Sequence, residues 1–176
     1  MQSPANQFRF ESVTFRDRTM LTNWLSIDSS QEWWGNPAQE LRLIFEGERT
    51  GESRGFIAHH SDHGPFAYIQ CWDPSRVPDH LVDQDPWVRD QAAGTLGVDI
   101  TIGVPTLLGK GLGSQTVFAF GDMLFAEGTP RLIIDPDARN TRAVRAYEKA
   151  GFTRFNSHTN ADGSITLLME RLPPKD

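Results

Sequence analysis

"LLGKGLGSQTVFAF" (residues 107–120) decides the fold, because three closely spaced glycines join a predicted strand to a predicted helix. The strand is "TLGVDITIGV" (residues 95–104), and the helix is expected to end near Ala126. A glycine-rich turn at a helix start leaves main-chain N–H groups free, and the helix dipole adds positive potential there. The stretch therefore fits a pyrophosphate site, although an ordinary tight turn would have the same composition.

Two familiar phosphate-binding loops do not match. The stretch has no Gly-Lys-Ser/Thr ending, which excludes a nucleoside-triphosphate P-loop. It also lacks the G-x-G-x-x-G spacing after a first strand, which argues against a dinucleotide site.

A second motif, "DPDARNTRAVRAYEKAGF" (residues 135–152), follows one strand later. Asn140 stands at a predicted helix start, Tyr147 lies two turns along the same face, and Gly151 ends the helix. The two motifs together resemble the Gcn5-related N-acetyltransferase (GNAT) superfamily. Its Q/R-x-x-G-x-G/A motif matches residues 108–113, with Leu108 in the first place, and its N-x-x-A-x-x-x-Y-x-x-x-G-F motif matches residues 140–152 throughout.

The resemblance implies an α+β GNAT (acyl-CoA N-acyltransferase) fold. That fold has a mixed central sheet of about seven strands with four helices, splayed between strands four and five. The predicted order β, α, α, β, β, β, α, β, α, β, β agrees with it, and residues 1–176 are expected to form a single domain. The other strands are predicted at residues 8–15, 53–60, 65–72, 131–135, 152–158 and 164–172, and the first two helices at residues 16–27 and 38–48. We expect "SSQEWWGNP" (residues 29–37) to be a loop and residues 73–94 to be a long irregular connection.

The resemblance also implies acetyl-CoA as the co-substrate, without a metal. The residues expected to contact acetyl-CoA are Leu108, Gly109, Lys110, Gly111, Leu112, Gly113, Ser114, Asn140, Thr101 and Ile102. Asn140 would bind the pantetheine arm, and a main-chain N–H between residues 101 and 103 would polarise the thioester carbonyl. Tyr147 would protonate the departing thiolate, whereas its alternative is core packing on an amphipathic helix.

A narrower likeness concerns the acceptor. "EWWG" (residues 32–35), "YIQCW" (residues 68–72) and residues 97–113 are similar to the bacterial aminoglycoside 6′-N-acetyltransferases. Direct attack needs a neutral amine, and a carboxylate beside the thioester can hold the ammonium and accept its proton. An aspartate within "TLGVDITIG" would be costly if it were buried without a purpose, so Asp99 is the predicted general base. The alternative is that Asp99 faces outward from its strand.

The remaining predicted acceptor residues are less specific. By the resemblance, the polycationic amine would meet Asp99, Asp135, Trp33, Trp34, Tyr68 and Gln70. Asp135 could equally be a turn residue, and Trp33 and Trp34 could equally be core residues. His59, His60 and His63 suggest a metal site, but a solvated loop fits them better.

Three other functions remain open. A siderophore-precursor acyltransferase acting on a hydroxylysine-type amine shares "GPFAYIQCW" and "DPDARNT", but that branch has histidine where this chain has Asp99. N-terminal protein acetylation is a second alternative. A non-catalytic acyl-CoA-binding protein would keep the glycines but would not need both Asp99 and Tyr147.

Composition limits the partners. The chain has 176 residues, 38% of them hydrophobic, and a net charge of −6, which argues against nucleic acid and anionic lipid as partners. The acidity fits either general solubility or an acidic pocket for a cationic small molecule. With one cysteine, Cys71, and no secretory pattern in "MQSPANQFRF", we expect a cytoplasmic monomer or homodimer with no membrane span.

Overall fold

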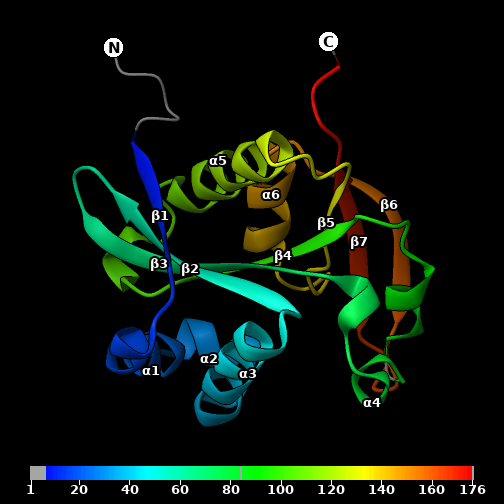
Figure 1. Ribbon diagram of the computed structural model, residues 1–176, viewed down its shortest axis with the longest axis horizontal. Coiled ribbons are helices and arrows are strands. Elements are labelled where there is room, and N and C mark those ends of the chain that lie inside the picture. The colour runs from blue at the N-terminus through cyan, green and yellow to red at the C-terminus, as the bar shows by residue number, and fades with distance from the viewer. Residues whose placement is uncertain (1–6, 84, 176) are drawn as a thin grey trace.

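The computed structural model describes residues 7–83 and 85–175 (Figure 1). The strands are β1 (Phe8–Ser12), β2 (Ser53–His60), β3 (Gly64–Trp72), β4 (Leu96–Ile102), β5 (Leu132–Ile134), β6 (Thr153–Thr159) and β7 (Ile165–Arg171). The helices are α1 (Arg18–Leu25), α2 (Asp28–Trp34), α3 (Pro37–Thr50), α4 (Asp79–Val82), α5 (Leu112–Ala126) and α6 (Thr141–Lys149). No helix in the described part of the chain is long and apolar enough to cross a membrane.

The strands form one seven-stranded sheet in the order β1-β2-β3-β4-β5-β7-β6. The β4–β5 pair is parallel and every other neighbouring pair is antiparallel. Helix α5 connects the two parallel strands in the sequence, so β4, α5 and β5 form the strand–helix–strand crossover that the glycine stretch predicts. The α+β fold with a mixed sheet, expected from the sequence, is therefore confirmed.

Helices cover the two faces of the sheet separately. Figure 1 shows α1, α2 and α3 on one side, with α5 and α6 on the other. Helices α1 and α3 pack Leu21, Leu25 and Ile44 against the sheet residues Ile57 and Tyr68. The larger core lies on the opposite face, where Phe120 of α5 is fully buried. This division places α2 and α3 on the same side of β4, with α5 and α6 behind it.

Residues 7–83 and 85–175 contain six α-helices, whereas four helices were predicted. Helix α2 (Asp28–Trp34) occupies most of the loop predicted at residues 29–37, and α4 is a single turn within the predicted irregular connection. The prediction was wrong for α2 because this helix has no long apolar stripe. Its support is tertiary: Ser30, 1% exposed, shares a 2.7 Å hydrogen bond with Thr101 of β4, and Trp34 packs edge-on against Tyr68.

Candidate active site

A cavity of about 630 Å³ lies where β4 and β5 separate. These strands pair only at Leu96–Leu132 and Gly97–Ile133, and β5 ends at Ile134 while β4 continues to Ile102. The far half of β4 therefore has no partner on that side, and the cavity extends from this opening to α6 and α2. The predicted separation of strands four and five is present.

The glycine loop forms one end of the cavity. Gly109 and Gly111 have φ values of 74° and 81°, a left-handed conformation that favours glycine. A Cβ at Gly109 would have no neighbour within 4 Å, so the loop is open rather than packed against protein. No side chain caps α5, whose N-cap is Gly111, and its first N–H groups are therefore available to an anion.

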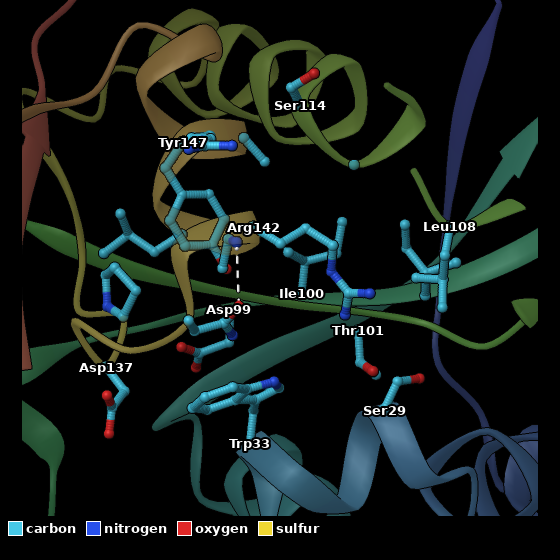
Figure 2. A pocket seen from close by; sticks show the side chains of 18 of the residues that line it. Ser29, Trp33, Asp99, Ile100, Thr101, Leu108, Ser114, Asp137, Arg142 and Tyr147 are labelled. Carbon is cyan, nitrogen blue, oxygen red and sulfur yellow. Dashed lines mark hydrogen bonds between the residues drawn. The ribbon is translucent and has the colours of Figure 1, made fainter. Parts of the chain in front are cut away.

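Helix α6 supplies the next part of the wall. The Asn140 side chain caps α6 by accepting a hydrogen bond from the Ala143 N–H at 3.1 Å, and both residues line the cavity. Tyr147 extends from α6 toward Asp99, while Trp33 approaches from α2 on the other side of that carboxylate (Figure 2). Burial raises the pKa of Tyr147, and the negative charges of Asp99 and Asp135 raise it further. The phenol is therefore protonated at neutral pH.

Asp99 lies at the centre of the cavity and carries hydrogen bonds. Gln70 Nε2 donates to Asp99 Oδ2 at 2.8 Å, and the Trp72 side chain also stabilises the ionised form of this carboxylate. Burial raises the pKa of Asp99, while the interactions with Gln70 and Trp72 lower it. A carboxylate with a raised pKa is a stronger base than a free aspartate in water.

The carboxyl groups of Asp135 and Glu40 also face the same space. Burial raises the pKa of Asp135, just beyond β5, well above its usual value, and the charges of Asp99 and Asp85 raise it further. Burial, and then the charge of Asp99, raise the pKa of Glu40 on α3 to about 7. Mutual repulsion of this kind makes the space attractive to a cationic group.

The structure brings all but three of the predicted site residues into the cavity wall. Lys110, Leu112 and Tyr68 lie outside it. Lys110 is exposed, Leu112 is buried in the first turn of α5, and Tyr68 is completely buried beneath the cavity. A direct acceptor contact by the Tyr68 side chain therefore has no support from its position.

Sequence reasoning missed several wall residues, notably Ser29, Glu40, Arg142, Arg145 and Lys149. The three cations recur along α6 with helical spacing, and that pattern could have been noticed beside Asn140. Figure 2 shows the Arg142 side chain extending from α6 toward Thr101. Glu40 carried no local signal, because it belongs to a helix whose approach to β4 depends on the whole sheet.

Comparisons with known proteins agree with this geometry. A family model described as an acetyltransferase (GNAT) domain matches residues 14–159. The chain belongs to the GNAT acetyltransferases. It is 30% identical over 175 residues to the aminoglycoside N(6′)-acetyltransferase type 1 of Klebsiella pneumoniae. The match covers 91% of this chain and 83% of that protein.

Solved structures give the same result for this GNAT acetyltransferase. The structure of AAC(6′)-Ib with coenzyme A and kanamycin has a TM-score of 0.79 and 27% identity, covering 94% of each chain. A complex of AAC(6′)-Ib with paromomycin and acetyl-CoA has a TM-score of 0.80 and 28% identity, covering 94% of this chain and 93% of the other. The GNAT fold expected from the two motifs is thus confirmed, and the chain is an N-acetyltransferase.

Proposed function

We propose that this enzyme transfers the acetyl group of acetyl-CoA to the 6′-amine of an aminoglycoside, within a single domain in the cytoplasm. The observation that carries the proposal is a cavity with an open glycine loop at one end and, at the other, the carboxyl groups of Glu40, Asp99 and Asp135 with two tryptophans. One end suits a diphosphate and the other a polycationic sugar. The names of the relatives agree with both parts.

The residues at the loop end fit acetyl-CoA. The diphosphate meets the N–H groups at the start of α5, and Gly109 and Gly111 leave room for its close approach. Arg142, Arg145 and Lys149 add positive charge along α6 in an otherwise acidic protein. Ser114 lies in the first turn of α5, where its hydroxyl donates to the Gly111 carbonyl.

The hydrogen-bond directions in β4 indicate which main-chain N–H groups can polarise the thioester carbonyl. The Leu96 N–H donates toward β5, to the Arg131 carbonyl, whereas the Gly103 N–H donates toward β3, to the Phe66 carbonyl. Because N–H directions alternate along a strand, those of Ile100 and Ile102 face the opening between β4 and β5. We assign the thioester contact to these two groups, of which Ile102 was predicted.

The acceptor enters between the tryptophans and the carboxyl groups. Asp99 holds the ammonium and accepts its proton, so that the neutral amine attacks the thioester carbon. The C–S bond breaks, and Tyr147, which burial keeps protonated, gives its proton to the thiolate sulfur. The second proton that the amine nitrogen loses as the amide forms restores the phenol. Asp135 and Glu40 face the other amines of the substrate, and Trp33 and Trp34 line the path of the sugar rings.

An acceptor panel tests the proposal. Acetyl-CoA consumption is measured with kanamycin, tobramycin, hydroxylysine and a peptide with a free N-terminus, and the acetylated position is read from the product by NMR. Turnover of the aminoglycosides with acetylation at the 6′-amine is the expected result. Turnover of hydroxylysine or the peptide alone would contradict the assigned acceptor, and binding of acetyl-CoA with no turnover of any amine would contradict catalysis.

A further inference from the structure

Three side chains of β3 lie on the sheet face that carries Asp99. Tyr68, Gln70 and Trp72 are two residues apart, so they share one face of the strand. In the antiparallel pairing of β3 with β4, Gln70 stands opposite Asp99 and Trp72 stands opposite Gly97. Gln70 therefore lies directly across from Asp99, and Tyr68 and Trp72 lie diagonally across from it in the two directions along the strand.

Hydrogen bonds connect these side chains in a fixed direction. Tyr68 Oη donates to Gln70 Oε1 at 2.7 Å, and Gln70 Nε2 donates to Asp99 Oδ2 at 2.8 Å. Burial raises the pKa of Tyr68 well above its usual value, so its hydroxyl stays protonated. Because the amide oxygen of Gln70 already accepts from Tyr68, the amide presents its N–H end to Asp99. The Trp72 ring lies over Gly97 on the same face, and it too stabilises the ionised form of Asp99.

Two strand glycines make room for these rings. A Cβ at Gly55 would lie 2.7 Å from Tyr68 Oη, and a Cβ at Gly97 would lie 2.0 Å from a ring carbon of Trp72. Gly55 is on β2 and Gly97 is on β4, so the rings lie over positions that have no side chain on the neighbouring strands. Glycine within a strand weakens a sheet, and close approach of another group is a common reason for its presence.

We propose that Tyr68 and Trp72 are positioning residues for Asp99: Trp72 acts directly, and Tyr68 acts through the amide of Gln70. The Gln70 amide and the Trp72 indole keep the carboxylate ionised and fix its orientation, leaving its remaining lone pairs for the substrate ammonium. The catalytic meaning of this inference rests on the proposed role of Asp99 as the base. It gives Tyr68, which is too deeply buried to touch the acceptor, a function beneath the cavity.

The surroundings of Asp99 make these donors important. Asp135 beyond β5 and Glu40 on α3 are acidic groups that interact electrostatically with it, and Tyr147 faces it from α6. Arg142 is the cation of α6 that extends across the same space (Figure 2). Among acidic neighbours, a carboxylate that loses a hydrogen-bond donor binds its proton more tightly. Removing Trp72, or the Tyr68 hydroxyl that orients the Gln70 amide, should therefore raise the pKa of Asp99.

A titration without substrate tests this directly. Protein labelled with carbon-13 at the aspartate carboxyls is titrated by NMR, and the Asp99 signal is identified by its loss in Asp99→Asn. In Tyr68→Phe, which keeps the ring over Gly55, we expect the Asp99 pKa to rise by about half a unit or more, and in Trp72→Phe by about one unit. The acidic limb of the kcat/KM profile should move to higher pH by a similar amount, with KM for acetyl-CoA unchanged.

Trp87→Phe is the matched control. The Trp87 indole donates to Asp85 rather than Asp99 and packs 6.4 Å from Trp72 between ring centroids. This variant should lose a comparable buried donor without moving the Asp99 titration. An unchanged Asp99 pKa in Tyr68→Phe would overturn the inference, and this variant decides the question if Trp72→Phe does not fold. If the pKa rises but Asp99→Asn retains full turnover, positioning stands and the proposed base is wrong.

Discussion

The two ends of the cavity are built in different ways. The glycine-loop end consists of backbone and of side chains close together in the sequence, from residues 108–114 and 140–149. The acceptor end collects single side chains from α2, α3, β3 and β4 and the turn after β5. The first end is a local motif that can bind the same carrier in many proteins. The second depends on tertiary packing and can be altered one residue at a time.

The largest expected effect comes from the point where the two ends meet. Asp99→Asn keeps the shape of the side chain but removes its basicity, so turnover should fall by about 10²–10⁴-fold. Acetyl-CoA affinity, measured by titration calorimetry, should stay close to that of the original protein because the loop end is untouched. Near-normal turnover would show that the base lies elsewhere.

The glycine-loop end is tested by Gly111→Val. A β-branched residue at φ 81° is strained, and its side chain would occupy the approach of the diphosphate. We expect acetyl-CoA to bind about 10–100-fold more weakly. Gly128→Val is the control, because Gly128 has φ 96° at the other end of α5 and does not line the cavity. It should lower stability and leave acetyl-CoA binding intact, and equal losses of binding in the two variants would contradict a diphosphate site at the loop.

The aromatic wall of the acceptor end gives a smaller effect. Trp33→Ala should raise the KM for an aminoglycoside by up to about tenfold, because ring contacts of this kind contribute roughly 0.5–1.5 kcal/mol. The KM for acetyl-CoA should not change, and Trp33→Phe should restore part of the acceptor affinity. A rise in both Michaelis constants would indicate that α2 supports the whole cavity instead of one end.

Glu40 gives the smallest effect, and it depends on pH. Its pKa of about 7 means that it becomes negative as pH rises through 7, so binding of a polycationic acceptor should tighten over that interval. In Glu40→Gln, the improvement in acceptor KM between pH 6 and pH 8 should be smaller by a factor of about three to five. Partly exposed charge pairs are worth at most about 1 kcal/mol, which corresponds to about a fivefold change in affinity. Acceptor KM measured from pH 6 to pH 8 is the test, with Glu46→Gln on the same helix as the control.

The same shift predicts the opposite change in stability. A carboxyl whose pKa is raised on folding binds more protons in the folded state, so its contribution to stability falls as pH rises from about 4.5 to about 7. Glu40→Gln should therefore raise the melting temperature at pH 8 and change it little near pH 4.5. A melting temperature that falls at pH 8 would mean that the ionised Glu40 has a favourable partner in the folded protein.

The sequence pointed to the framework of the loop end, although it missed the cations of α6. The glycine spacing, Asn140 and Tyr147 lie within about forty residues, and local turn and helix geometry relates them. Asp99 was also predictable, because a carboxylate within an apolar strand needs a reason. The acceptor end was predicted less well: α2 was taken for a loop, Tyr68 for a contact residue, and Glu40 was missed.

What the sequence alone determined is the order of elements and the carrier-binding motif, since both follow from short-range periodicity and from the freedom of glycine at positive φ. Only the tertiary structure decided which side chains surround Asp99. The Ser30–Thr101 hydrogen bond attaches α2 to β4, and cross-strand pairing places Gln70 and Trp72 beside the carboxylate. Contacts of this kind join residues about 30 to 70 positions apart, and no local pattern in the chain records them.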